Sequence, residues 1–116
     1  MQHEFPVRVY YEDTDMAGIV YHANYLKFIE RARSEWVKGM GIDQNALREH
    51  EGVVFVIRRI EADFRASARF DDELVVQTRV QSVSGVRLVL HQEVQRAGEA
   101  LFTAEVTLVS MTLDGQ

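Results

Sequence analysis

The chain has 116 residues, of which 47% are hydrophobic and 27% are charged, and its formal net charge is -5 at pH 7. This length allows one hydrophobic core, so we expect residues 1–116 to form a single domain. The acidic balance argues against nucleic acid or an anionic membrane as a partner, because both select for clustered lysine and arginine. The absence of cysteine excludes disulfides, a thiolate nucleophile and cysteine-ligated zinc, and it is typical of a reducing compartment.

Nothing in the sequence predicts targeting or membrane insertion. The first residues, Met1 to Pro6, have neither the cationic start nor the apolar run of a secretory signal. All apolar runs are shorter than the roughly 18 residues that a transmembrane helix needs. The sequence therefore predicts a soluble, cytoplasmic globular protein without a membrane span.

The N-terminal part of the sequence predicts a strand and then an acidic loop. Between residues 6 and 11, Val7, Val9 and Tyr11 alternate with their neighbours, which is typical of a strand with one buried face. Residues 12–18, with the sequence EDTDMAG, combine acidic side chains with a final glycine. We expect this segment to be a loop.

A long helix is predicted from Asn24 to Gly39. Its apolar residues recur at helical spacing, which predicts one buried side: Tyr25, Phe28, Ile29, Ala32, Trp36, Val37 and Met40. The residues that lie off this stripe are Glu30, Arg31, Arg33, Ser34, Glu35 and Lys38. Asn24 is the candidate N-cap, and Gly39 and Gly41 are a plausible stop. A second, short helix is predicted from Asp43 to Glu49.

Four further strands are predicted after Gly52. They are rich in Val, Ile, Leu and Thr and span Val53–Phe64, Glu73–Val83, Arg87–Arg96 and Ala100–Thr112. Turn sequences separate them at Phe70-Asp71-Asp72, Ser84-Gly85 and Ala97-Gly98. The short connections predict that the last three strands form an antiparallel meander. The predicted fold class is α+β, with the long helix lying on a five-stranded antiparallel sheet.

Several familiar catalytic motifs are absent from the sequence. It has no Gly-x-Ser-x-Gly elbow, no His-Glu-x-x-His, and no glycine-rich phosphate or dinucleotide loop. Asp13, Asp15 and His22 do not complete a metal coordination set, so no metal site is predicted. The candidate catalytic site is therefore the acidic loop together with the helix start that follows it.

A carboxylate beside a helix N-terminus can attack an activated carbonyl. The first helical turn has unpaired N–H groups and a partial positive charge that can hold an oxyanion, while a carboxylate of the acidic loop attacks the carbonyl carbon or activates water. A thioester needs little more, because its leaving thiol has a pKa of about 8.5. Asp15 can also be read as a simple turn residue, and Asp13 is expected to bond loop amides.

The run at residues 11–25, YEDTDMAGIVYHANY, resembles the signature of hotdog-fold acyl-CoA thioesterases. It is most similar to their Tol-Pal-associated branch, which is related to 4-hydroxybenzoyl-CoA thioesterase. The resemblance extends through Glu30-Arg31-Ala32-Arg33 and Phe70-Asp71-Asp72 and covers nearly the whole chain. It implies a long helix wrapped by a curved sheet, paired into dimers and often tetramers with active sites at the interface.

The resemblance also implies a substrate and roles for individual residues. The expected substrate is an acyl-CoA or acyl-carrier-protein thioester, and no cofactor is expected because coenzyme A is part of the substrate. Asp15 is the implied catalytic residue, as nucleophile or general base. The backbone N–H of His22 is the implied oxyanion donor, and its side chain would orient water or substrate. Gly18, Val20 and Tyr21 are the expected substrate contacts.

One departure from the related aryl-CoA enzymes concerns the phosphates of coenzyme A. Those relatives carry a basic cluster before the fourth strand, where this chain has SVSGV at residues 82–86 followed by Arg87. The cations available elsewhere are Arg58, Arg59, Arg65 and Arg69, and of these Arg58 and Arg59 are the candidates.

Two other functions stay open on the sequence. A hotdog enoyl-CoA hydratase needs a closely paired Asp and His, and the offset between Asp15 and His22 is wider than that pairing suggests. A non-catalytic acyl-CoA binding module would bind the thioester without turnover. Measured hydrolysis, hydration or binding alone would separate the three.

Overall fold

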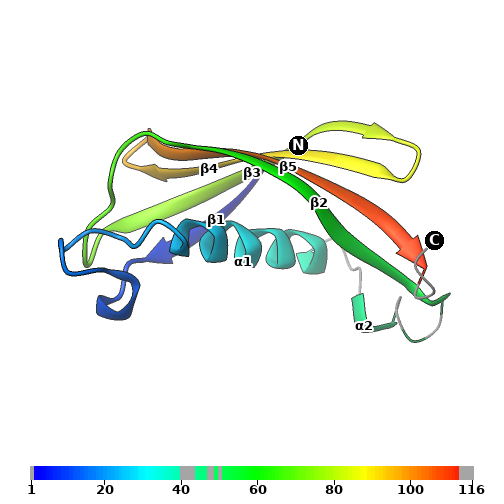
Figure 1. Ribbon diagram of the computed structural model, residues 1–116, viewed down its shortest axis with the longest axis horizontal. Coiled ribbons are helices and arrows are strands. Elements are labelled where there is room, and N and C mark those ends of the chain that lie inside the picture. Colours follow the sequence, from blue (N-terminus) through cyan, green and yellow to red (C-terminus); the bar gives the residue numbers. More distant parts are fainter. Residues whose placement is uncertain (1, 40–43, 47–48, 50, 113–116) are drawn as a thin grey trace.

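The computed structural model describes residues 2–39, 44–46, 49 and 51–112. A curved five-stranded sheet arches over one long helix (Figure 1). The strands are β1 (Gln2–Arg8), β2 (Val53–Phe64), β3 (Glu73–Ser84), β4 (Arg87–Arg96) and β5 (Glu99–Thr112). The helices are the 3₁₀ helix η1 (Tyr11–Asp13), α1 (Asn24–Gly39) and α2 (Gln44–Ala46).

All neighbouring strands of the sheet are antiparallel, in the order β1-β3-β4-β5-β2. The α+β class and the meander of the last three strands are therefore confirmed. β2 and β4 have the predicted bounds, while β3 ends one residue later than predicted, at Ser84, and β5 begins one residue earlier, at Glu99. The order leaves β1 and β2 as the two edges of the sheet.

The predicted N-terminal strand is wrong at both ends. The strand begins at Gln2 and stops at Arg8, and Tyr11, which was assigned to its buried face, is 82% exposed in η1. The cause is a side-chain bond, since the Tyr10 N–H donates to Asp13 Oδ2 at 2.8 Å and turns the chain into a 3₁₀ helix. Val9 is buried in the core and Val7 is half-buried against it, as predicted.

The predicted bounds of α1 are confirmed, and so is its apolar stripe. The buried members of the stripe are Tyr25, Phe28, Ile29, Ala32 and Trp36. Val37 is half-buried, and Met40 lies outside the described residues. Of the predicted second helix, Gln44–Ala46 is helical, whereas Asp43 lies outside the described residues. Gly41, which was part of the predicted stop of the long helix, lies outside them as well.

Two predictions for α1 are wrong. Arg33 was placed off the stripe, yet it is only 8% exposed, because its guanidinium Nη1 donates to Gln92 Oε1 of β4 at 2.9 Å. Asn24 was the candidate N-cap, but it is the first residue of the helix. Its side-chain Nδ2 donates instead to the Asp13 carbonyl at 2.9 Å.

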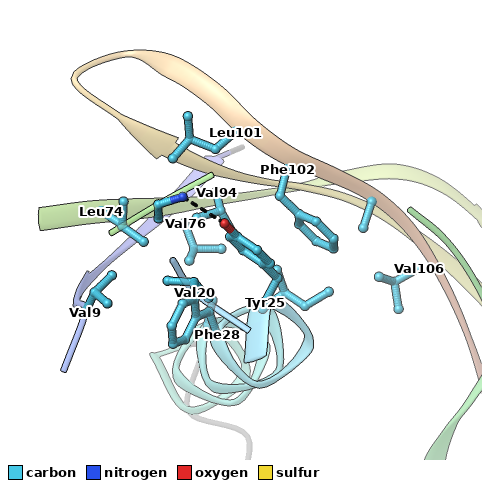
Figure 2. Packing of buried hydrophobic residues seen from close by; sticks show 14 of the residues in the cluster. Val9, Val20, Tyr25, Phe28, Leu74, Val76, Val94, Leu101, Phe102 and Val106 are labelled. Carbon is cyan, nitrogen blue, oxygen red and sulfur yellow. Dashed lines mark hydrogen bonds between the residues drawn. The ribbon is translucent and has the colours of Figure 1, made fainter. Parts of the chain in front are cut away.

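The core lies between α1 and the concave face of the sheet. Tyr25 stacks on Phe102 of β5 with ring centroids 5.1 Å apart, and Phe28 lies edge-on to Tyr25 (Figure 2). The helix packs mainly against β1, β3 and β4. The half of the concave face formed by β5 and β2 is therefore less covered, and this is where the cavities described below open. Within the described residues, no helix has the length and apolar character to cross a membrane.

We expect Phe102→Ala to lower the free energy of unfolding by roughly 3–5 kcal/mol, because the substitution leaves a cavity beside the Tyr25 ring. Urea unfolding measures the change. The matched control is Phe70→Ala, since Phe70 is exposed and should change stability by no more than about 0.5 kcal/mol. Equal losses in the two variants would contradict the packing described here.

Candidate active site

Asp13 organises the acidic loop. Its Oδ2 accepts the Tyr10 N–H, and its carbonyl accepts both the Tyr21 N–H at 2.9 Å and the Asn24 side chain at 2.9 Å. These bonds tie the beginning of the loop to the beginning of α1. The expectation that Asp13 bonds loop amides is confirmed.

Asp15 lies in the tight turn that follows. Its backbone N–H donates to the Ile19 carbonyl at 2.9 Å, and the Gly18 N–H donates back to the Asp15 carbonyl at 2.9 Å. Gly18 has a φ of 80°, a conformation that glycine adopts without steric cost. The Ala17 N–H donates to Asp15 Oδ1 at 2.9 Å, so this oxygen does serve the turn. The other oxygen, Oδ2, has no hydrogen-bond partner among the described residues and is free for chemistry.

Asp15 faces a cleft of about 290 Å³ between the start of α1 and the end of β2. The remaining walls of the cleft are formed by Ile19, Val20, His22, Tyr25, Phe64, Arg65, Ala66 and Ser67. The cleft is therefore lined by a carboxylate, an imidazole, a guanidinium and a hydroxyl, which belong to Asp15, His22, Arg65 and Ser67. Phe64 is 49% exposed, so the cleft is open towards the β2 edge of the sheet.

Residues 65–67 form the far wall of the cleft, and the residues that follow, Ala68 and Arg69, are bonded to the loop and to Tyr25. The Val20 N–H donates to the Ala68 carbonyl at 2.8 Å, and Ile19 forms an antiparallel bridge with Arg69. The Ala68 N–H donates to the Tyr25 hydroxyl oxygen at 3.0 Å, the bond drawn as a dashed line in Figure 2. Burial raises the pKa of Tyr25, which keeps this hydroxyl neutral at physiological pH.

The turn Phe70-Asp71-Asp72 stabilises the same wall through the side chain of Asp72. Asp72 Oδ2 accepts the Arg69 N–H at 2.8 Å and Arg96 Nη1 at 2.7 Å. Burial acts to raise the pKa of Asp72, but these two bonds and the charges of Arg96 and Arg69 outweigh it and hold the pKa below its usual range. The carboxylate therefore stabilises the turn in its ionised form.

The start of α1 leaves two backbone donors free beside this cleft. The carbonyls of Tyr21, His22 and Ala23 accept the first N–H groups of the helix at 2.8, 3.4 and 3.2 Å. The N–H groups of His22 and Ala23 themselves have no acceptor among the described residues. The positive end of the helix dipole lies at the same place. Asp15 and His22 line the same cleft, so the arrangement suits a carbonyl group that is approached by a carboxylate and polarised by an amide at the helix start.

Comparison with known proteins decides the family. Residues 17–103 match the thioesterase superfamily. The chain belongs to this superfamily. It is 41% identical over 109 residues to the acyl-CoA thioesterase YbgC of Haemophilus influenzae, covering 94% of this chain and 80% of that protein. It is 46% identical over 106 residues to the acyl-CoA thioester hydrolase YbgC of Escherichia coli, covering 90% and 78%.

Solved structures agree with this family. A probable thioesterase from Bartonella henselae matches with a TM-score of 0.94 at 36% identity, covering 100% of this chain and 96% of that one. The resemblance to hotdog-fold thioesterases is confirmed, and the helix wrapped by a five-stranded sheet is the hotdog fold.

The thioesterase cleft contains part of the predicted site. Asp15 and His22 both line it, and so does Val20. The Val20 side chain also belongs to the core, and its N–H is used by Ala68. Gly18 shapes the turn from outside the cleft wall. Tyr21 lies outside the wall too, with its ring 4.7 Å from the His22 ring.

The two predicted phosphate-binding arginines do not line the cleft of their own chain. Arg58 and Arg59 are exposed on β2, and Arg59 forms an ion pair with Glu61. Arg65 is the cation in the cleft wall, and its Nε lies 3.2 Å from Asp63 Oδ2.

The sequence interpretation missed the wall residues Phe64, Ala66 and Ser67. The only signal for them was their position between the end of a predicted strand and the Phe70-Asp71-Asp72 turn. Among the described residues, no three His, Asp or Glu side chains are grouped closely enough to hold a metal ion.

We expect Asp72→Asn to lower the free energy of unfolding at neutral pH by about 1–2 kcal/mol, because a charge-assisted bond to Arg96 is lost. A carboxylate with a lowered folded-state pKa contributes stability above its unfolded pKa of about 3.9 and loses it as pH falls through the folded value. The difference from wild type should therefore shrink below about pH 4. Urea unfolding across pH measures this, and Asp71→Asn is the exposed control. A difference in the free energy of unfolding that stays constant with pH would contradict the stabilising role of the ionised Asp72.

Proposed function

We propose that this thioesterase hydrolyses acyl-CoA thioesters to a free carboxylic acid and coenzyme A, with Asp15 as the catalytic carboxylate. The observation that carries the proposal is the cleft that Asp15, with one free carboxylate oxygen, lines together with His22, whose unpaired N–H lies just before α1. The names of the two YbgC relatives, an acyl-CoA thioesterase and an acyl-CoA thioester hydrolase, support this substrate class.

The proposed reaction needs few groups. The thioester oxygen accepts the N–H groups of His22 and Ala23, which stabilise the negative charge that develops on it. Asp15 either attacks the acyl carbon, giving an anhydride that water then opens, or removes a proton from water that attacks directly. In both routes the carbon–sulfur bond breaks, the acid keeps an oxygen from water, and a proton goes to the thiolate. The thiolate leaves readily because its conjugate acid has a pKa of about 8.5.

The remaining site residues are proposed as substrate contacts. The His22 imidazole is suited to orient water, since it lines the cleft next to Phe64. Gly18, Val20 and Tyr21 are proposed to contact the substrate from the loop before α1, and of these three Val20 lines the cleft. Arg58 and Arg59 are proposed to hold the phosphates of coenzyme A from the β2 edge. No cofactor is proposed, because coenzyme A enters as part of the substrate.

We expect Asp15→Asn to lower kcat roughly 10²- to 10⁴-fold, because the carboxylate can no longer act as base or nucleophile. Thiol release from a panel of acyl-CoA thioesters at neutral pH measures the rate. Asp71→Asn makes the same chemical change at an exposed turn and should leave kcat unchanged.

Full activity of Asp15→Asn would refute the assignment of this residue. Tight binding of acyl-CoA by the wild-type chain without thiol release would favour a binding module instead. Addition of water to crotonyl-CoA without thiol release would favour a hydratase.

We also propose that two copies of the chain pair through β2 and complete each other's site. β2 is an edge strand, and its apolar side chains Phe55, Ile57 and Phe64 are 44%, 45% and 49% exposed. Pairing two such edges would bury these side chains and satisfy the free backbone groups. The Asp15 cleft opens at this same edge, which supports an active site at the interface.

The wider setting is proposed from the resemblance. Residues 1–116 are proposed to act as one domain, in a homotetramer built from such dimers. The proposed location is the cytoplasm, in association with the Tol-Pal system, and an acyl-carrier-protein thioester is the second proposed substrate form.

We expect Ile57→Lys to weaken the dimer at least about ten-fold, because pairing would bury an uncompensated charge. Light scattering across a concentration series measures the dissociation constant. Val83→Lys is the matched control, because Val83 is 69% exposed on β3 and away from the β2 edge. Identical dissociation constants for the two variants would refute the β2 interface.

A further inference from the structure

A second cavity of about 240 Å³ lies further along the same helix. It is enclosed by the C-terminal half of α1 and by the concave sides of β2, β4 and β5. Most of its lining is apolar, including Trp36, Phe55, Ile57, Leu88, Leu90 and Leu108. A cavity of this kind suits a hydrocarbon chain. Its one buried charged group is the side chain of Arg33.

A hydrogen-bond network fixes the guanidinium of Arg33 at the cavity wall. Gln92 Nε2 donates to the Ile29 carbonyl at 3.0 Å and to Thr78 Oγ1 at 2.9 Å, which uses both of its hydrogens. Its oxygen is left to accept Arg33 Nη1 at 2.9 Å. Because both Thr78 and Gln92 are fully buried, the anchored side of the guanidinium is rigidly held.

The other side of the guanidinium lacks a counter-ion. Among the described residues, no carboxylate lies within ion-pair distance of Arg33, and one of its five N–H donors is used by Gln92. The acid whose charge acts on Arg33 is Glu30, which also lines this cavity. Glu30 is exposed, and its Oε2 accepts the Ser34 hydroxyl at 2.7 Å. Burial lowers the pKa of Arg33, and Glu30 acts in the opposite direction. A buried cation at the wall of an apolar cavity is costly unless an anion pairs with it.

We propose that this cavity binds the far end of the acyl chain and that Arg33 holds a carboxylate at that end. The preferred substrates are then thioesters of straight-chain dicarboxylic acids, a conclusion that rests on the proposed thioesterase function. A guanidinium binds a carboxylate through two parallel N–H bonds, which fits the free side of Arg33.

The positions of the two cavities along α1 support a single extended substrate. Tyr25 lines the Asp15 cleft and Arg33 lines the second cavity, and eight residues of helix between them span about 12 Å. The thioester would lie at the helix start and the distal carboxylate two turns further along.

The test compares substrates that differ only at the far end. CoA monothioesters of dicarboxylic acids are assayed against CoA thioesters of the monocarboxylic acids with equal carbon number, over a series of lengths. We expect the wild-type chain to favour the dicarboxylic series in kcat/KM by at least about ten-fold at its best length. Hydrolysis of the monocarboxylic series with rejection of the dicarboxylic series at every length would overturn the inference and leave the proposed function intact. Hydrolysis of neither series would remove the proposed function itself.

The role of Arg33 is tested by Arg33→Met, which should lower the ratio of the two kcat/KM values by about ten- to a hundred-fold. The ratio is independent of the folded fraction, so a merely structural role of Arg33 would leave it unchanged. Arg31→Met makes the same change on the exposed side of α1 and should keep the wild-type ratio. Should Arg33→Met fail to fold, Arg33→Lys keeps the charge but not the paired N–H bonds and should lower the ratio in part. An unchanged ratio in either variant would overturn the assignment.

Discussion

The bond between the Tyr25 hydroxyl and the Ala68 N–H connects the parts of this structure that matter for function. Tyr25 is the second residue of α1, stacks on Phe102 of β5 and lines the Asp15 cleft. Ala68 in turn accepts the Val20 N–H from the loop. The buried ring of Tyr25 therefore connects the core, the start of the helix and both walls of the cleft. Such a bond is costly to break, because the amide would be left buried without a partner.

The uneven cover of the sheet explains where the cavities lie. Because α1 packs mainly on β1, β3 and β4, the concave sides of β5 and β2 are left partly open. Both cavities lie in this opening, one at each end of β2. Phe55 and Phe64, which line these cavities, are exposed. Exposed apolar side chains at a sheet edge are typical of a surface that binds a ligand or a second copy of the chain.

Local chemistry made most of the fold predictable from the sequence. The bounds of α1 and β2 follow from apolar periodicity and from the turns that interrupt it. Contacts between distant residues were not predictable in this way. Arg33 was predicted to be exposed because its partner Gln92 is 59 residues away in the sequence. Ser67 lines the cleft beside Ala68, whose bonds to Val20 and Tyr25 join segments far apart in the sequence. Asp15 was found because its turn and the helix start are adjacent in the chain.

The helix combines two ways of holding a negative charge. At its start, unpaired amides and the dipole face the place where a thioester oxygen would become an oxyanion. About two turns later the side chain of Arg33 offers a full charge inside an apolar space, fixed there by Gln92. A cavity that only held hydrocarbon would gain nothing from a buried guanidinium and would have to offset its desolvation. The charge is explained if the ligand brings an acidic group to the same end of the cavity.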